Sequence, residues 1–251
     1  MIAVVVGIGL VALAAAISVR RQLGVERELA TTVVRAVLQL GAVALVIQAI
    51  FDRLGLSAAF VVVMLGAAGW TAGRRLDGLP RPRLLAATAI TGSAALTLLA
   101  LFVAGAFPVT PRYLIPLAGI VIGGAMKATS VAGLRLVEEV VDKRADIEAR
   151  LALGASAGEA LRPWLRRATV TALIPAIDQT KNVGLVSLPG AFVGMLLGGE
   201  SPLRAAWVQL TVLFALLGAE ALAATVTTVL VARAVTRPGE RIEPPIRRSA
   251  A

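Results

Sequence analysis

Apolar stretches long enough to cross a lipid bilayer dominate this sequence. A helix needs about 20 mostly apolar residues to cross the hydrocarbon core of a membrane. Seven stretches approach or reach that length: residues 2–19, 33–51, 56–73, 84–107, 113–133, 183–198 and 207–232. The sixth is short and glycine-rich, and residues 168–177 either extend it or lie at the membrane interface. The sequence therefore predicts an all-α, polytopic membrane protein with about seven transmembrane helices.

The composition supports this class and excludes several kinds of site. Hydrophobic residues make up 58% of the chain and charged residues 16%, whereas soluble domains carry about 25% charged residues. There is no cysteine and no histidine, which excludes disulfides, thiolate metal sites and the commonest transition-metal ligand. The net charge of +10 could suggest nucleic acid, but the cytoplasmic loops of membrane proteins collect Lys and Arg. We therefore expect no nucleic-acid partner.

Lys and Arg alternate in number from loop to loop. The loops after the first, third, fifth and seventh stretches hold 20 of them, and the other three loops hold one each. Because positive loops face the cytoplasm, this alternation predicts an external N-terminus and a cytoplasmic C-terminus. The charges near residue 20 follow the first apolar run instead of preceding it, which argues against a cleaved signal peptide. We predict a membrane domain over 1–233 and a disordered cytoplasmic tail over 234–251.

The loop after the fifth stretch has the pattern of a helix, a break and a second helix. Apolar residues recur at helical spacing through 134–153, with charged residues on the opposite side. Gly154 is a natural helix stop, and Ser156 with Glu159 has the spacing of a capping box. We expect the second helix to end near Pro163, with an apolar face around Leu161 and Trp164 that meets a partner.

This segment, 134–167, is suited to transmit a conformational change from a soluble motor protein, because it is short and held between membrane spans. The same pattern also occurs in loops with a structural role only. Its residues resemble the EAA loop of ABC transporter permeases, which docks on the cytoplasmic ATPase. The resemblance rests on Glu148-Ala149 followed by Gly154, although the third position is Arg150. It implies that the dock is shaped by Glu148, Ala149, Gly154, Ser156 and Glu159.

Further motifs extend the resemblance to the FetB-like permeases. They are RAVLQLGAV (35–43), YLIPLAGIVIGGAM (113–126), LALGAS (151–156), LIPAIDQTKNVGLVSLPG (173–190) and GGESPLRAAWVQL (198–210). This family comprises half-transporter membrane subunits linked to bacterial iron export and plant aluminium tolerance. The resemblance implies a multi-pass permease of the cell membrane, an exporter linked to metal homeostasis and a homodimer.

The chain lacks any GxxxxGKS/T phosphate loop. We therefore expect no enzymatic activity and no cofactor on this chain. ATP and Mg²⁺ would bind to a separate ATPase subunit, as the resemblance implies.

Charged and amide side chains within the apolar stretches are candidates for a translocation pathway, because such groups are costly in a membrane. Arg35, Lys127 and Glu220 are the charged ones, and Gln39 shares the helix face of Arg35. Snorkelling to the interface or hydrogen bonds between helices are the structural alternatives. Glu220 is the strongest single candidate. The DQTKNVGLVSLPG motif adds three more, Asp178, Gln179 and Lys181, of which the first and last have the spacing of an ion pair.

Glycines at four-residue spacing predict close helix packing, which could include a dimer seam. They are Gly119, Gly123, Gly190, Gly194 and Gly198. The family has methionine and amide residues after Leu188-Pro189-Gly190, where this chain has mostly apolar residues 191–195. Oxygen ligands remain at Asp178, Glu200 and Glu220, and the sequence leaves a metal site unassigned.

Two other function classes compete with an ATP-driven permease subunit. An ion-gradient-driven secondary transporter would have inverted repeats and broken helices. We find no such repeat, but the Pro- and Gly-rich region 175–199 keeps this alternative open. An intramembrane enzyme fits least, because the spans carry no histidine, cysteine or clustered carboxylates.

Overall fold

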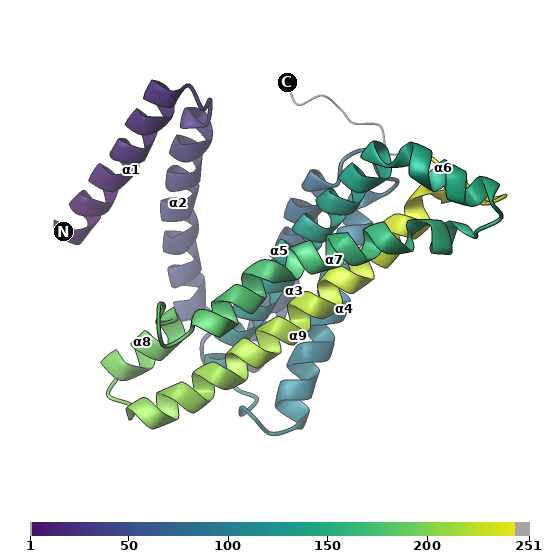
Figure 1. Cartoon of the computed structure of the whole chain (residues 1–251). Helices are drawn as coiled ribbons and strands as arrows, with labels where there is room; N and C mark the ends of the chain where they lie inside the picture. The colour runs from purple at the N-terminus through teal and green to yellow at the C-terminus, as the bar shows by residue number, and fades with distance from the viewer. Residues whose placement is uncertain (1, 244–251) are drawn as a thin grey trace. The chain divides into compact units, whose positions relative to one another are not determined.

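The computed structural model describes residues 2–243 as helices and one small hairpin (Figure 1). Their bounds are α1 (Ile2–Arg21), α2 (Glu26–Ile50), α3 (Leu54–Arg75), α4 (Pro82–Val103), α5 (Pro111–Asp142), α6 (Arg144–Ala152), α7 (Ala157–Asn182), α8 (Gly190–Leu197), α9 (Pro202–Val235), β1 (Thr236–Arg237) and β2 (Arg241–Ile242). The chain divides into two units at Arg53, each described by itself below. The predicted helical class is confirmed.

The first unit is a helical hairpin of α1 and α2. Gly24, at φ +71°, belongs to the turn between them. The Ser18 hydroxyl donates to Glu26 Oε1 at 2.7 Å and so ties the end of α1 to the start of α2. Many large apolar side chains of α2, such as Val37 and Leu40, are exposed within this unit. A lipid environment explains an apolar surface of this kind.

The second unit is a bundle in which α5 packs against α3, α4, α7 and α9, and α9 also packs against α4 and α7. Its core is rich in fully buried alanine, including Ala72, Ala86 and Ala118. Small residues let helix backbones approach closely, which is how helices associate in membranes. Gly133 belongs to the same design, because a Cβ there would collide with the Leu76 side chain.

Five described helices are both long and apolar enough to cross a membrane. They are α2, α3, α4, α5 and α9. α1 coincides with the first stretch predicted from the sequence. The protein is therefore a polytopic membrane protein.

The sixth predicted stretch, residues 183–198, is wrong as a single helix. α7 ends at Asn182 and α8 has only 8 residues, a length of about 12 Å. Gly184 at φ +83° and Pro189, which is the N-cap of α8, separate the two helices. Apolar composition alone could not detect this break.

The predicted end of a short helix near Pro163 is also wrong, because α7 continues through Pro163 and Pro175 to Asn182. An interior proline removes a hydrogen bond and destabilises a helix by about 3 kcal/mol. Burial of Leu161 and Trp164 beside Pro163 offsets this loss.

The chain after α9 is ordered up to the last described residue. β1 and β2 pair antiparallel, Thr236 with Ile242 and Arg237 with Arg241, and Ile242 packs against the core. The predicted disorder of 234–251 therefore does not hold for Thr236–Ile242, where apolar contact and strand pairing compensate the ordering entropy. Residues 244–251 lie outside the described part.

Candidate coupling segment and intramembrane pocket

The coupling segment, 134–167, begins on α5 and continues into α6 after one break. Lys143, at φ −106° and ψ 21°, separates the two helices, so the single helix expected through 153 is interrupted there. The predicted apolar face persists across the break, because Val140 and Ile147 are both almost fully buried. These contacts tie α6 to the bundle.

Gly154 ends α6 in the way predicted. Its φ is +91°, a conformation that L side chains rarely adopt. The Ala155 N–H donates to the Arg150 carbonyl at 3.1 Å, and the Gly154 N–H donates to the Leu151 carbonyl at 3.0 Å. This is the Schellman arrangement that satisfies the last carbonyls of a helix.

Ser156 and Glu159 form the predicted capping box at the start of α7. The Ser156 N–H donates to Glu159 Oε2 at 2.9 Å, and the Glu159 N–H donates to Ser156 Oγ at 3.3 Å. Hydrogen bonds from the Ser156 hydroxyl and then its backbone N–H hold the pKa of Glu159 below its ordinary value. Both bonds favour the ionised carboxylate.

The hairpin after α9 adds a contact that was not predicted from the sequence. Glu240, between β1 and β2, accepts a hydrogen bond from the Ala157 N–H. Ala157 is the first residue of α7, where N–H groups lack helical partners. The C-terminal hairpin therefore holds the start of α7 in place, across 83 residues of sequence. Long-range partners of this kind leave no periodic signal.

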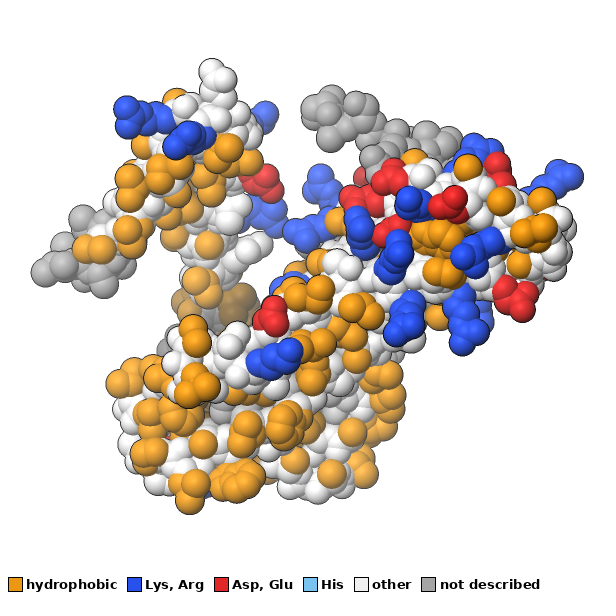
Figure 2. Space-filling view, in the orientation of Figure 1, with side chains coloured by type: hydrophobic (Ala, Val, Ile, Leu, Met, Phe, Trp, Pro, Cys, Tyr) orange, Lys and Arg blue, Asp and Glu red, His pale blue; other side chains and the backbone are white. Residues whose placement is uncertain are grey.

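The tip of the segment presents Leu153, whose residue surface is 89% exposed. Glu148 and Ala149 are exposed as well, and Glu148 accepts from Arg144 Nε at 2.7 Å. The expectation that Leu161 and Trp164 face a partner is wrong, because both are buried in the core. Helical periodicity identified their apolar face but could not decide whether it faces inward. In Figure 2, charged side chains gather around this end of the second unit.

A pocket of about 180 Å³ brings polar residues from four helices together inside the second unit. Arg75 of α3, Lys127 of α5, Gln179 of α7 and Glu220 of α9 line it. Glu220 is only 5% exposed, and among the described residues it forms no hydrogen bond or ion pair within 4 Å. Lys127 and Arg75 are both exposed, which places them at the rim of the pocket. This is the arrangement expected of a functional intramembrane acid.

Three of the seven pathway candidates meet in this pocket: Lys127, Gln179 and Glu220. Asp178 and Lys181 are exposed on α7 and do not form the ion pair suggested by their spacing. Arg35 and Gln39 lie on α2 in the first unit, which is described separately. Arg75 was not predicted from the sequence, because this residue belongs to a basic cluster of the cytoplasmic type and its place in the same pocket as Lys127 depends on tertiary packing.

The predicted packing glycines have different surroundings. A Cβ on Gly119 would lie 3.3 Å from Met64 Cε. One on Gly123, Gly190 or Gly194 would meet no described atom within 4 Å, and one on Gly198 would meet only carbonyls of its own turn. Their role in packing stays a prediction that needs a second chain. Gly124, which is not among the predicted packing glycines, lies directly against Leu216 and Glu220.

No group of three or more acidic side chains that could hold a metal ion occurs among the described residues. Glu200 is paired with Arg204 at 3.5 Å. Asp178 is exposed on α7, and Glu220 stands opposite two cationic side chains. The three carboxylates that remained as possible oxygen ligands therefore do not form one site.

Comparison with known proteins agrees with the resemblance to FetB-like permeases. The chain is 41% identical to the rice UPF0014 membrane protein STAR2, over 88% of this chain and 78% of that protein. It is 37% identical to the Arabidopsis thaliana protein ALUMINUM SENSITIVE 3, over 88% and 81% of the two chains. It is 33% identical to the probable iron export permease protein FetB of Escherichia coli, over 89% and 87%.

No solved structure matches the chain. A model of the uncharacterised protein family UPF0014 matches residues 1–236, which include helices α1 to α9, the coupling segment and the pocket. The chain belongs to the UPF0014 family of membrane proteins.

Proposed function

We propose that this chain is the membrane subunit of an ABC transporter, driven by a separate ATPase that docks on the tip around Leu153. The observation that carries the proposal is this tip. Leu153 is 89% exposed. It lies between the Schellman motif that ends α6 and the capping box that starts α7, and other side chains leave most of its surface uncovered. Exposed apolar side chains that are surrounded by polar residues and held on rigid helices are typical of protein interfaces.

The helices on either side of the tip are suited to transmit movement. α7 starts just after the tip and has 26 residues, and α5, which is joined to the tip through α6, has 32, so the two helices are about 40 and 50 Å long. Both pack on α9, and Thr169 Oγ1 of α7 lies 3.2 Å from Thr228 Oγ1 of α9. A displacement of the tip would therefore tilt α5 and α7 against α9, where Glu220 lies.

The proposed topology retains seven crossings, an external N-terminus and a cytoplasmic C-terminus. The sixth crossing consists of the second half of α7 together with the break at 183–189 and α8. This arrangement keeps the alternation of Lys and Arg between loops, because the coupling segment and the hairpin after α9 stay on the same side. ATP and Mg²⁺ would bind to the ATPase subunits of a homodimeric transporter in the cell membrane.

The substrate site in this proposal is the pocket around Glu220. The name of the Escherichia coli relative, probable iron export permease, supports an exporter with a role in metal homeostasis. A buried carboxylate opposite Lys127 could bind and release a cationic or hydrogen-bonding group as the helices tilt. Glu220→Gln should lower transport without preventing ATPase binding, which separates the two parts of the proposal.

Co-purification with the ATPase tests the proposal. We expect Leu153→Asp to abolish the complex, because an aspartate cannot fill the apolar contact. Leu203→Asp is the matched control, since Leu203 is 69% exposed but lies at the start of α9, on the opposite side of the proposed topology. A stable complex with the Leu153 variant, or equal loss with both variants, would contradict the docking assignment.

One observation favours a second candidate, a secondary transporter driven by an ion gradient. The Glu220 carboxylate lies beside Lys127 in a broken-helix protein, an arrangement also found in proton-coupled carriers. Transport in liposomes under an imposed proton gradient, without any ATPase, distinguishes the two. We expect no uptake or efflux under those conditions.

A further inference from the structure

A second pocket lies between α5 and α7, and most of its lining residues belong to the coupling segment. Its volume is about 700 Å³. The lining includes Arg135 and Glu139 from α5 and Arg166, Arg167, Val170 and Thr171 from α7. The proposed coupling and transport steps use none of these side chains.

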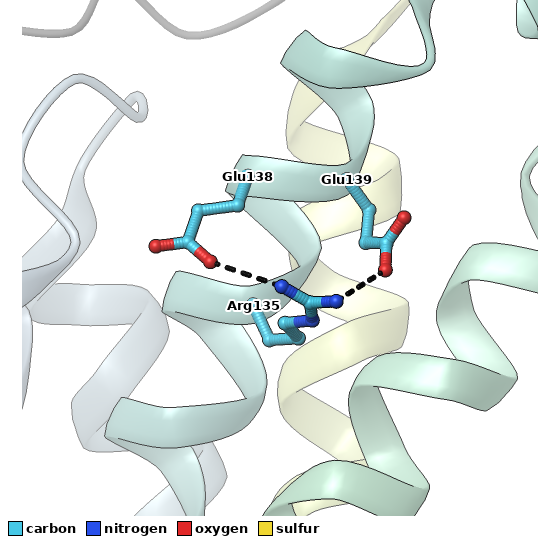
Figure 3. Close-up of polar contacts among 3 residues, drawn as sticks. All are labelled: Arg135, Glu138 and Glu139. Atoms are coloured by element: carbon cyan, nitrogen blue, oxygen red, sulfur yellow. Dashed lines mark hydrogen bonds and ion pairs between the residues drawn. The ribbon is translucent and has the colours of Figure 1, made fainter.

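Only part of the positive charge in this pocket is neutralised. Arg135 Nη1 lies 3.4 Å from Glu138 Oε2, and Arg135 Nη2 lies 3.0 Å from Glu139 Oε1 (Figure 3). Arg135 is thus occupied by carboxylates, and the buried Glu139 is compensated. Arg166 and Arg167 are exposed and form no ion pair with any described residue. Two guanidinium groups are therefore available to an anion.

The pocket is placed at the depth of lipid headgroups. Arg135 lies 24 residues after Pro111, the first residue of α5, or about 36 Å along the helix. The hydrocarbon core of a bilayer is about 30 Å thick. A helix that enters the membrane near Pro111 therefore brings Arg135 just past the opposite edge of the core.

Exposed apolar side chains continue from the pocket toward the membrane interior. Val170 and Ile174 follow Arg166 and Arg167 at helical spacing on α7, and Val131 lies one turn before Arg135 on α5. All three are exposed. A cationic pocket above exposed apolar side chains matches a ligand with an anionic head and a hydrocarbon chain, and a free inorganic anion would leave these side chains uncovered.

We propose that the pocket between α5 and α7 binds an anionic phospholipid. Arg166 and Arg167 donate to the phosphate, and an acyl chain covers Val170 and Ile174. Basic pockets between membrane helices recognise acidic lipids in this way. Because Arg166 and Arg167 belong to the coupling segment, on the helix that Ser156 caps, the lipid anchors that segment to the membrane surface.

Native mass spectrometry of the full-length protein in detergent tests this site. The probes are dioleoylphosphatidylglycerol and the zwitterionic dioleoylphosphatidylcholine. We expect the wild type to retain the anionic lipid preferentially. Arg166→Gln combined with Arg167→Gln should lower that retention about twenty-five-fold, since one basic residue near an anionic surface contributes about fivefold.

Two controls keep the result specific. Arg162→Gln removes an exposed charge from the same helix outside the pocket, and should retain the lipid as the wild type does. The double Arg→Lys variant keeps both charges and should recover most of the retention, which excludes misfolding as the cause of a loss.

Several outcomes would overturn the proposal. They are equal retention of the two lipids by the wild type, unchanged retention in the double Gln variant, and displacement of the lipid by inorganic phosphate. Dissociation of a dimer by the double Gln variant with lipid retention intact would instead identify the pocket as an interface between copies. None of these measurements depends on an ATPase.

Discussion

Gly124 of α5 gives Glu220 of α9 the space that it occupies. A Cβ on Gly124 would lie 2.7 Å from Glu220 Oε1 and would collide with Leu216. The absence of a side chain at one position on α5 therefore fixes where the buried carboxylate of α9 can stand. This pair links the packing of the bundle to the chemistry of its pocket.

The first prediction concerns this pair. Gly124→Ala should destabilise the protein by about 1–3 kcal/mol, the usual effect of overpacking a close contact. Gly123→Ala is the control, because a Cβ there meets no described atom, and alanine favours a helix by up to about 1 kcal/mol over glycine. Denaturant unfolding of both purified variants measures the difference. Equal stability of the two would contradict the contact.

A second prediction concerns the end of α6. Gly154→Val should weaken coupling, because a β-branched residue at φ +91° is strained by at least about 1 kcal/mol. We expect lower transport and an ATPase that no longer responds to substrate, with insertion into the membrane unchanged. Gly158→Val is a suitable comparison, since Gly158 is helical and a Cβ there has open space. Wild-type coupling in the Gly154 variant would contradict this role.

A third prediction concerns the pH dependence of the α7 cap. The pKa of Glu159 is lowered by the Ser156 hydroxyl and backbone N–H. A depressed folded-state pKa means that the cap is at full strength above the unfolded-state value and weakens as pH falls through the folded-state value. Opening of the first turn of α7, measured by hydrogen exchange after correction for intrinsic rates, should rise below about pH 4. Glu159→Gln should remove this dependence, and its persistence in that variant would assign it to another group.

A fourth prediction concerns the C-terminal hairpin. Glu240→Ala removes the acceptor for the Ala157 N–H, and a lost helix cap costs about 1 kcal/mol. Hydrogen exchange at Ala157 should therefore become about fivefold faster. Glu243→Ala is the control, because the Glu243 carboxylate pairs with the exposed Arg237 at 2.6 Å and forms no hydrogen bond or ion pair with a described residue of α7. Equal protection of the Ala157 N–H in both variants would contradict the claim that the hairpin holds the start of α7 in place.

Local signals in the sequence were sufficient for the helical class, for the stop at Gly154 and for the box of Ser156 and Glu159. Each depends on residues a few positions apart, where spacing determines geometry. The break after Asn182 could not be predicted, because apolar composition does not distinguish a continuous helix from two shorter ones. The pocket at Glu220 could not be predicted either, because its lining comes from four separate helices. Arg75, Gly124 and Glu240 act through partners more than 50 residues away, so no local pattern could identify them.

Site-specific crosslinking tests the central claim, that Leu153 is the point at which an ATPase docks. The chain contains no cysteine, so Leu153→Cys and the control Leu185→Cys each carry one reactive thiol. Each variant would be labelled with a photoreactive thiol reagent and assembled with candidate ATPase subunits from the source organism, starting with one encoded beside this chain. We predict a crosslink to the ATPase from position 153 and none from position 185. A crosslink from position 185 alone, or none from position 153 within an assembled complex, would contradict the account.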